Sequence, residues 1–514
     1  MRIQLIHPPV YLNVHALTAL RPSMPLGLAY IGANLRRAGH EVSVLDAVAL
    51  APDRVTREGK IHRLGLPPEE IPERLDPRAE AFAVTNMWSF SWPLVRDILR
   101  RIKTARPDAV LVCGGEHFTG LPEFSLREAP IDYIVLGEGD ETAVELFAAL
   151  AAGDPVDDVA GLAYLRDGEL VRTKGRGRTK DIDELPWPAW DLIDVKTYND
   201  YGFVTGLHAG MTIPILATRG CPYQCTYCSS PNMWTTKYVT REPEDVADEI
   251  ESYYRTYGAR NFPFQDLTAI VKRDWIIAFC QELLARDLQG ITWQFPSGTR
   301  CEVIDDEVAA LLFQTGGRAL AFAPESGSER TRALIKKRMK TESLLSAVEA
   351  SVRNGLNITA FLVIGFPHDI KQDLKETERL VRKLAIMGID DIAIGFFFPI
   401  PNTELYEQLL QRNVVRLDDD FLLTPIFAND EKLLEDNNYC DHMSARELTR
   451  WKYRLLLNFY GLSFATRPWR ILTVLANTAR GKETRKLETF LVELKRKSAV
   501  WLKGRRAQAG ATGA

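Results

Sequence analysis

The chain has 514 residues, and because single domains mostly span about 50–250 residues, we expect two to four domains. Its net charge of −4, with 46% hydrophobic and 26% charged residues, is typical of a globular protein and gives no sign of a nucleic-acid partner. No run of about 18 apolar residues is present, which excludes a membrane span. The opening MRIQLIHPP resembles a strand rather than a secretory signal, so the sequence predicts a cytoplasmic protein.

Residues 1–150 alternate between short apolar strands and helical patterns. The expected strands are 2–9, 41–47, 79–86, 109–115 and 132–139. A helical pattern runs from Leu26 to Ala38 and stops at Gly39. Strands that are apolar on both faces are typical of a parallel sheet covered by helices, so we predict an α/β, doubly wound, Rossmann-like domain. Ligands of such sheets bind beyond the carboxyl ends of the strands.

Residues 151–205 have a different character. A hairpin with its turn at Asp167-Gly168 is expected first. The following stretch, 174–194, is polar and then rich in Pro and Trp. We interpret 151–205 as a linker with a hairpin that packs on both neighbouring domains.

From 206 to 425 the alternation of strands and helices resumes. The expected strands are 214–220, 261–266, 292–299, 320–326, 358–367 and 390–401, and the expected helices are 245–257, 273–286, 306–314, 328–337, 342–354 and 371–387. Six strands with crossover helices predict a partial (β/α)6 barrel of the TIM type. Residues 426–514 are expected to form a helical C-terminal region.

Three of the seven cysteines, Cys221, Cys225 and Cys228, fall within eight positions in the spacing CxxxCxxC. Three thiolates on a short loop can bind three irons of a 4Fe–4S cubane and leave the fourth iron without a protein ligand. S-adenosylmethionine can chelate that open iron, and electron transfer then gives a 5′-deoxyadenosyl radical. The alternatives are a structural zinc, which needs a fourth ligand that is not nearby, or three unrelated core cysteines. The four cysteines outside this motif are Cys113, Cys280, Cys301 and Cys440.

On these residues, 206–425 resembles the core of a radical S-adenosylmethionine (SAM) enzyme. The resemblance implies that Tyr227, before the last cysteine, contacts adenine and that Asp266 contacts the methionine amino group. It places Glu325 and Ser326 near the ribose, Gly365 near adenine, and Arg300 at a frequent third-strand position. For each of these residues, strand-end turn chemistry is the structural alternative.

Residues 1–150 resemble the cobalamin-binding domain that precedes many radical SAM enzymes. The matching pieces are 25–30, 39–42, 114–119 and 137–142, and the implied contacts are Asn86, Gly114, Gly115, Glu116, His117, Gly137 and Glu138. The DxHxxG motif that supplies a histidine to cobalt is absent, so the lower axial position is open to His7, His117, Asn86, water or nothing. The alternative is a domain that kept the fold and lost the ligand.

The segment from Asp441 to the end has sixteen Lys or Arg and five Asp or Glu, a net charge of +11. Trp451, Trp469 and Trp501 lie among these cations. One interpretation is a helical cap with a solvated face. The other is peripheral contact with a membrane or a lipid-like substrate.

Together the two resemblances imply a cobalamin-dependent radical SAM methyltransferase. One S-adenosylmethionine methylates the cobalamin, a second gives the radical that removes a hydrogen atom from an unactivated carbon, and the substrate radical takes the methyl group. We expect a small-molecule or lipid-like substrate and an external electron donor of the flavodoxin or ferredoxin type. An oxidative cyclase or rearrangement enzyme of the same fused class, without net methylation, is the alternative activity. A non-catalytic cobalamin sensor or carrier is a third, against which the three cysteines argue.

Overall fold

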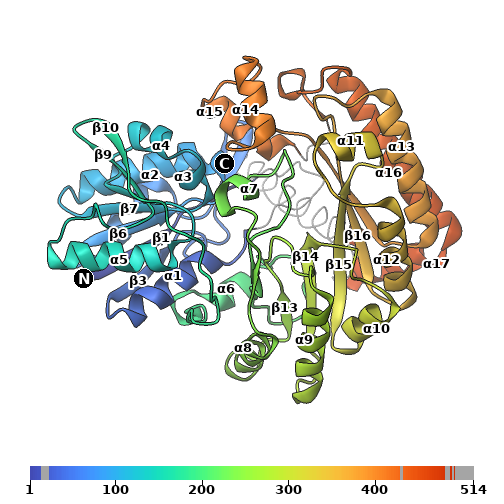
Figure 1. Cartoon of the computed structure of the whole chain (residues 1–514), viewed down its shortest axis with the longest axis horizontal. Helices are drawn as coiled ribbons and strands as arrows, with labels where there is room; N and C mark the ends of the chain where they lie inside the picture. The colour runs from blue at the N-terminus through green and yellow to red at the C-terminus, as the bar shows by residue number, and fades with distance from the viewer. Residues whose placement is uncertain (13–21, 429–431, 481–486, 489–490, 492–514) are drawn as a thin grey trace, which may run out of the picture.

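The computed structural model of the chain describes residues 1–12, 22–428, 432–480, 487–488 and 491. Two α/β units lie side by side, the N-terminal unit coloured blue to teal and the second unit green to orange (Figure 1). Each unit is built on its own parallel sheet.

The N-terminal unit is a sheet with helices on both faces. Its main elements are β1 (Arg2–His7), α1 (Leu26–Arg37), β3 (Glu41–Asp46), β6 (Ala81–Thr85), α2 (Trp92–Ala105), β7 (Val110–Gly114), α3 (Glu116–Gly120), α4 (Pro122–Glu128), β8 (Tyr133–Val135) and α5 (Gly139–Ala152). The parallel strands lie in the order β3-β1-β6-β7-β8. Because the chain runs from β1 to β3 on one side and then to β6 on the other, the switch point of the sheet lies between β1 and β6. The doubly wound prediction is confirmed.

The expected hairpin forms from β9 (Leu162–Arg166) and β10 (Glu169–Arg172). Asp167 and Gly168 both have positive φ, as a two-residue turn of this twist requires. Strand β9 also pairs antiparallel with β8, so the hairpin extends the N-terminal sheet rather than belonging to a separate linker. The sheet therefore reaches residue 172, beyond the expected boundary at 150, because pairing along an exposed strand edge leaves no local sequence pattern.

A second, smaller sheet in the N-terminal unit did not emerge from the sequence. It is formed by β2 (Val10–Leu12), β4 (Val55–Glu58) and β5 (Ile61–Leu64) in the order β2-β5-β4. Short 3-10 helices follow at η1 (Pro68–Glu70), η2 (Pro72–Arg74) and η3 (Ser89–Ser91), and later at η4 (Trp190–Leu192) beside α6 (Val195–Asp200). Strands this short carry too few residues for a periodic signal.

The second unit is an open sheet of five parallel strands in sequence order. Its strands are β13 (Asn261–Pro263), β14 (Thr292–Thr299), β15 (Gly317–Glu325), β16 (Asn357–Ile364) and β17 (Asp391–Phe396), and its helices are α8 (Pro243–Thr256), α9 (Arg273–Ala285), α10 (Asp306–Gln314), α11 (Glu329–Leu334), α12 (Thr341–Arg353) and α13 (Lys371–Met387). Within the described residues β13 and β17 are the end strands of this five-stranded sheet and do not pair with each other, so the barrel is partial, as predicted.

The first expected barrel strand is irregular. Thr212 and Ile215 make isolated parallel bridges to the β13 segment. Within the expected strand 214–220 only β11 (Thr218–Arg219) is regular, and it pairs with β12 (Val239–Thr240). Pro214 lacks a backbone N–H and so interrupts the hydrogen-bond ladder. The segment still adds a sixth position to the sheet, and it ends where the cysteine loop begins.

The C-terminal region is helical where it is described, as expected. It contains α14 (Glu404–Gln411), α15 (Asp419–Leu423), η5 (Thr424–Phe427), η6 (Glu435–Asn437), α16 (Ala445–Thr466) and α17 (Trp469–Arg480). Two of its cations, Arg467 and Arg470, donate to carbonyl oxygens at the end of α13, including Met387 (3.1 Å) and Ile389 (2.7 Å). Cations are favourable at the carbonyl end of a helix, so these two act as a structural cap.

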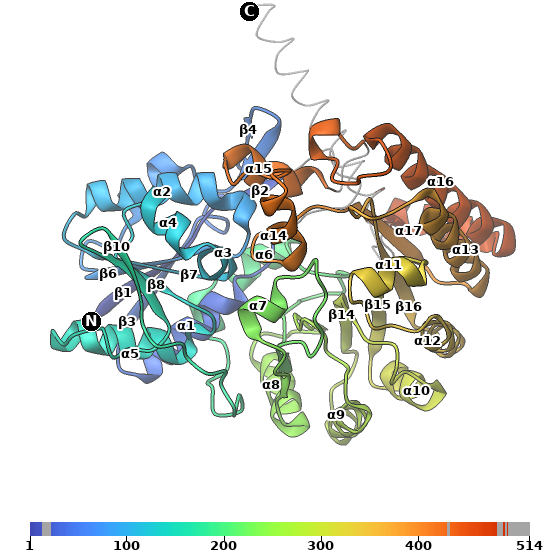
Figure 2. The same ribbon diagram turned by 45° about the horizontal axis from the view of Figure 1, so that its top comes forward.

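The two units share a hydrophobic core. Helices α14 and α15 lie against the N-terminal unit (Figure 2), and Phe421 and Leu422 pack in one cluster with Ile6, Phe82 and Ile98. Arg96 of α2 also pairs with Asp419 at 2.5 Å. The carboxyl edge of the first sheet is thus fixed against the barrel. None of the described helices has the length and hydropathy needed to cross a bilayer.

Candidate functional site at the domain interface

The clustered cysteines lie in the loop between β11 and α7 (Ser230–Trp234). Gly220 precedes Cys221 with a φ of +87°, and a Cβ there would collide with the Lys237 carbonyl oxygen. Glycine is therefore required where the chain enters the loop. The Thr226 N–H donates to the Ile335 carbonyl oxygen (3.1 Å), so the residues after α11 support the loop from the barrel side.

The thiols of Cys221, Cys225 and Cys228 are half-buried, whereas the other four cysteines are buried, and all seven are free of disulfides. Burial raises the pKa of Cys221 and Cys225, and the charge of Lys337 opposes that rise. Among the described residues no three His, Cys, Asp or Glu side chains gather around a point that could hold one metal ion. In a cubane each of three thiolates would bind its own iron, so the thiols need not meet at one point.

Tyr227, Glu325 and Lys337 form a largely buried hydrogen-bonded group beside the cysteines. The Tyr227 hydroxyl donates to Glu325 Oε1 (2.7 Å), and Lys337 Nζ donates to the same oxygen (3.0 Å). Glu325 Oε2 accepts no hydrogen bond from any described residue. Burial lowers the pKa of Lys337, but Glu325 and Cys225 more than reverse this, so the Lys337 pKa lies above its ordinary value. The group holds a fixed cation and a carboxylate with one unused oxygen.

Glu325 also has a strained backbone. It ends β15 at an irregular register with β16, and its φ is +62°. A non-glycine residue in this region costs on the order of 1 kcal/mol or more and persists only where its surroundings fix it. The strain at Glu325 therefore marks the carboxylate as a functional candidate.

Arg300 lies under the cysteine loop. Its guanidinium is 3.9 Å from the ring centroid of Tyr223, which stands between Cys221 and Cys225, and it pairs with Glu302 (Nε to Oε2, 3.0 Å). Stacking of a guanidinium on an aromatic ring orients both groups. Arg300 is thus placed to hold the cysteine loop through its contact with Tyr223.

Asp266 is fully buried and engaged within the protein. It accepts hydrogen bonds from Thr218 Oγ1 (2.5 Å) and the Ala217 N–H (3.3 Å). Burial raises its pKa to about 6, against these hydrogen bonds. Asp266 joins the β13 segment to β11 and so supports the strand that leads into the cysteine loop.

Ser326 and Gly365 lie in buried turns at the ends of neighbouring strands. Ser326 Oγ lies 3.2 Å from Thr377 Oγ1 of α13. The N–H groups of Gly365 and Phe366 both donate to Asp369 Oδ2 (3.0 Å each). Gly365 has a φ of +86°, and the Phe366 ring contacts Tyr227 edge-on, with centroids 5.7 Å apart. This turn therefore forms one side of the Tyr227 surroundings.

The switch-point edge of the N-terminal sheet offers a second set of groups. Asn86 is buried at the end of β6, and its Nδ2 finds no hydrogen-bond partner in the described part of the chain. The next two side chains, Met87 and Trp88, are 54% and 57% exposed. Gly115 has a φ of +109°, and a Cβ there would lie 2.7 Å from the Asn86 carbonyl oxygen. An orphaned amide, a close backbone approach and exposed apolar groups suit a large flat ligand such as a corrin.

His117 is held inside the N-terminal unit. Its two ring nitrogens face Ser89 Oγ (3.1 Å) and Ser125 Oγ (3.2 Å), and its ring stacks on Trp92. Burial lowers its pKa to about 3. His117 therefore acts as a neutral core residue here. His7, the other histidine considered, has Nδ1 2.9 Å from Asp46 Oδ1 and 3.2 Å from the Tyr198 hydroxyl.

The remaining expected cobalamin contacts lie where the two units meet. Burial raises the pKa of Glu116, and hydrogen bonding to Trp234 of α7 opposes the rise. Glu138 accepts hydrogen bonds from Arg178 (2.9 Å) and the Thr179 N–H (3.0 Å). Gly114 ends β7, and the Gly137 N–H donates to Thr119 Oγ1 (3.0 Å). Glu116 and Glu138 therefore join the sheet to the cysteine loop and its linker.

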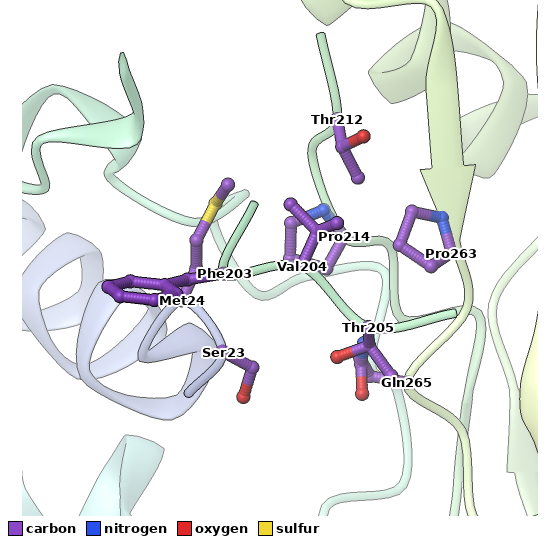
Figure 3. A pocket seen from close by; sticks show the side chains of 9 residues that line it. All are labelled: Ser23, Met24, Phe203, Val204, Thr205, Thr212, Pro214, Pro263 and Gln265. Carbon is purple, nitrogen blue, oxygen red and sulfur yellow. The ribbon is translucent and has the colours of Figure 1, made fainter. Parts of the chain in front are cut away.

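A small pocket lies on the inner face of the barrel. It is lined by Ser23, Met24, Phe203, Val204, Thr205, Thr212, Pro214, Pro263 and Gln265 (Figure 3). Side chains alternate along a strand, and Phe264 faces outward against Phe279 of α9, so Pro263 and Gln265 face the interior. Ser23 and Met24, just before α1, contribute the part of the lining that comes from the N-terminal unit.

Four important residues were not found from the sequence. Lys337 lies in a basic run, Lys336-Lys337-Arg338, and such a run predicts solvent-exposed side chains. Asp369 and Tyr223 have no distinguishing spacing. Asp140 binds Arg219 across the domain interface at 2.5 Å, and only the assembled fold brings these two together. The one usable sequence signal was that Arg219 directly precedes Gly220-Cys221.

Comparison with known proteins agrees with this geometry. The model of the B12 binding domain matches residues 13–147, and the model of the Radical SAM superfamily matches residues 215–381. An uncharacterized methyltransferase of Pyrococcus horikoshii is 27% identical over 416 residues, 81% of this chain and 84% of that protein. The anaerobic magnesium-protoporphyrin IX monomethyl ester cyclase of Rubrivivax gelatinosus is 27% identical over 417 residues, 80% and 70% of the two chains.

A solved structure has the same fold. It is the radical S-adenosylmethionine methyltransferase TsrM from Kitasatospora setae, with cobalamin and a 4Fe–4S cluster bound. Its TM-score is 0.64 at 18% identity, and the match covers 80% of this chain and 75% of TsrM.

Proposed function

We propose that the chain methylates an unactivated carbon of a small-molecule or lipid-like metabolite. It combines a B12-binding domain with a radical S-adenosylmethionine domain, as the cobalamin-dependent radical SAM enzymes do. The observation that carries the proposal is the juxtaposition of two sites. The half-buried thiols of the barrel and the apolar edge at Asn86, Met87 and Trp88 belong to units joined by a common core.

The barrel residues are suited to bind the cluster and S-adenosylmethionine. When bound, the cluster supplies the electron that cleaves S-adenosylmethionine, and cobalamin supplies a carrier for the methyl group. Cys221, Cys225 and Cys228 would bind the cluster. We assign the unused Oε2 of Glu325 to a ligand hydroxyl and the Tyr227 ring to adenine packing. The fully buried Phe366 ring supports Tyr227 edge-on. Lys337 pairs with the Glu325 carboxylate and orients it.

The N-terminal edge is suited to bind cobalamin without a side-chain ligand from a DxHxxG loop. Asn86 Nδ2 is available to an amide oxygen of the corrin periphery, and Gly115 permits close approach of the backbone. Met87 and Trp88 would pack on the ring and exclude water. Gly114, Glu116, Gly137 and Glu138 would shape the edge, Glu116 and Glu138 through the linker and α7. His117 is committed to Ser89 and Ser125 and would support the edge from within the core.

We place the substrate between the two sites, over the interior of the barrel. The interior pocket is lined by Met24, Phe203, Pro214 and Pro263 beside Thr212 and Gln265. This pocket is about 10 Å³, room for about one water, so it marks the lining of the interior and is not itself the substrate cavity. An external one-electron donor of the flavodoxin or ferredoxin type would reach the cluster through the partly exposed cysteine loop.

A second activity is favoured by one specific observation, the likeness to a magnesium-protoporphyrin cyclase. An oxidative cyclase would use the same cluster and cobalamin without net methylation. The two activities differ in product mass, because methylation adds one CH2 unit per event and cyclisation does not.

The experiment is anaerobic incubation of reconstituted protein, cobalamin, reductant and methyl-deuterated S-adenosylmethionine with a metabolite extract. The proposal expects a deuterated methyl product, S-adenosylhomocysteine and 5′-deoxyadenosine. The methyl product and 5′-deoxyadenosine should be absent with Cys225→Ala. A product that lacks deuterium would favour the cyclase. Absence of 5′-deoxyadenosine would reject both radical activities.

We also propose that α16 and α17 bring the enzyme to an anionic lipid surface, where a lipid-like substrate would be found. Leu457, Trp469, Leu472 and Leu475 are 59–73% exposed, and the segment from Asp441 onward carries +11. Each cation near such a surface contributes about 1 kcal/mol. Trp451 packs against the core, and Trp501 lies outside the described residues. Flotation with anionic but not neutral vesicles at low salt is expected, and equal behaviour with both would end this proposal.

A further inference from the structure

Two acidic residues at the start of α5 bind three partners from outside the N-terminal domain. Asp140 binds Arg219 through two hydrogen bonds, Nη1 to Oδ2 (2.5 Å) and Nη2 to Oδ1 (3.2 Å). Glu138 binds Arg178 and the Thr179 N–H. We name Glu138, Asp140, Arg178 and Arg219 the α5 ion-pair cluster.

The cluster is buried rather than a surface feature. The side chains of all four members are 5–12% exposed. The Arg219 guanidinium also lies 5.3 Å from the ring centroid of Tyr30 in α1, and Asn34 Nδ2 donates to Asp140 Oδ1 (3.3 Å). Carboxylates in the first turn of a helix are stabilised by its dipole, so α5 presents two ordered anions to the barrel. A bidentate, buried pair fixes direction as well as distance.

The cationic partners lead directly to the cysteine loop. Arg219 is two residues before Cys221. Arg178 donates to the Trp234 carbonyl oxygen and lies 5.7 Å from the Trp234 ring centroid, and Trp234 ends the helix that follows Cys228. The N-terminal domain therefore holds both ends of the loop that carries the three thiols.

We propose that Arg219 and Asp140 are positioning residues that set the register of the N-terminal domain against the cysteine loop. In this role they touch neither substrate nor cofactor. They determine how far the edge at Asn86, Met87 and Trp88 lies from the thiols, and this distance matters for any reaction that uses both sites.

The test compares Asp140→Asn and Arg219→Lys with Glu141→Gln in the full-length protein. Asn keeps an oxygen for Asn34, and Lys keeps the charge while losing the planar fork. Glu141 is the neighbouring control, because its half-exposed side chain pairs with Arg176 and Thr179 and not with any described residue of the cysteine loop.

Hydrogen exchange of segments 139–152 and 219–238 is measured together with iron content. We expect both segments to exchange at least about tenfold faster in Asp140→Asn, less so in Arg219→Lys and not at all in Glu141→Gln, with iron content retained. In the protein loaded with cob(II)alamin and reduced cluster, the magnetic interaction between the two centres should weaken in the same order.

Arg219→Lys keeps the proposal testable if Asp140→Asn does not fold. Unchanged exchange and an unchanged magnetic interaction in Arg219→Lys would overturn the proposal. So would faster exchange confined to one of the two segments, because a purely local structural role moves only one side.

Discussion

The cysteine loop of the barrel and the carboxyl edge of the N-terminal sheet meet at one interface, yet they differ in the kinds of side chain that they present. Around the cysteines, charged and polar groups are paired, as in Tyr227-Glu325-Lys337 and Arg300-Tyr223. The sheet edge presents exposed Met87 and Trp88, a glycine, and an Asn86 Nδ2 that no described residue pairs with. The loop is suited to a cofactor held by covalent ligands and charge. The edge is suited to one held by shape.

The largest effect is expected from removing a thiol. Cys225→Ala should lose the cluster and lower 5′-deoxyadenosine formation to the background, because two thiolates leave a cubane incompletely bound. Cobalamin binding at the other site should remain. Cys280→Ala is the matched control, since Cys280 is buried against Thr315 far from the loop in sequence and lacks ligand spacing. Undiminished 5′-deoxyadenosine from Cys225→Ala would refute the assignment.

Next in size is the buried cation. Lys337→Met leaves Glu325 buried without its partner, which should cost about 3–5 kcal/mol in the free energy of unfolding. The double variant Lys337→Met with Glu325→Gln should regain part of that loss. Lys336→Met is the control, because Lys336 pairs with a half-exposed Glu404 and its loss should cost less than about 1 kcal/mol. Urea unfolding that ranks Lys336→Met as the more damaging change would be inconsistent with a buried pair at the site.

A glycine substitution should affect the edge of the N-terminal sheet rather than the cysteine loop. Gly115→Ala forces a Cβ against the Asn86 carbonyl at a φ of +109°, a cost of about 1–3 kcal/mol, and should weaken cobalamin binding while the cluster is retained. Gly27→Ala, in α1 with open space around it, should bind cobalamin normally. Visible absorption titration and iron content report both cofactors. Equal cobalamin affinity in the two variants would remove Gly115 from the site.

The smallest expected effect is on the pH dependence of the free energy of unfolding, to which one residue in each unit contributes with opposite sign. Because burial lowers the folded pKa of His117 to about 3, the unfolded chain takes up a proton first, and stability is lost as pH falls below about 6.5. Burial raises the folded pKa of Asp369 to about 6, so this carboxyl has the opposite sign and favours the folded state as pH falls from about 6 toward 4.

Urea midpoints between pH 7.5 and 5 measure the two contributions. Relative to the unchanged protein, His117→Gln should flatten the loss in acid, by up to about 1.4 kcal/mol per pH unit. Asp369→Asn should steepen it, because the compensating group is removed. Parallel pH profiles for both variants would contradict these assignments.

The difference between the two regions also explains what the sequence could predict. Runs such as 306–314 and 371–387 gave helix bounds identical to those of α10 and α13, because their apolar spacing is long and regular. The CxxxCxxC spacing pointed directly to the cluster loop. Lys337 was hidden because burial of a lysine depends on the fold, and Asp140 with Arg219 are 79 residues apart. The hairpin β9-β10 was expected, but its pairing with β8 was not.

We predict that the cysteine loop and the edge at Asn86, Met87 and Trp88 are two halves of one site. The most direct test is electron paramagnetic resonance of the protein loaded with cob(II)alamin and the reduced 4Fe–4S cluster. We predict a cob(II)alamin signal that is broadened by the nearby cluster, carries no strong single-nitrogen splitting from a histidine, and sharpens in Cys225→Ala. An unbroadened signal that is the same in both proteins would contradict the account.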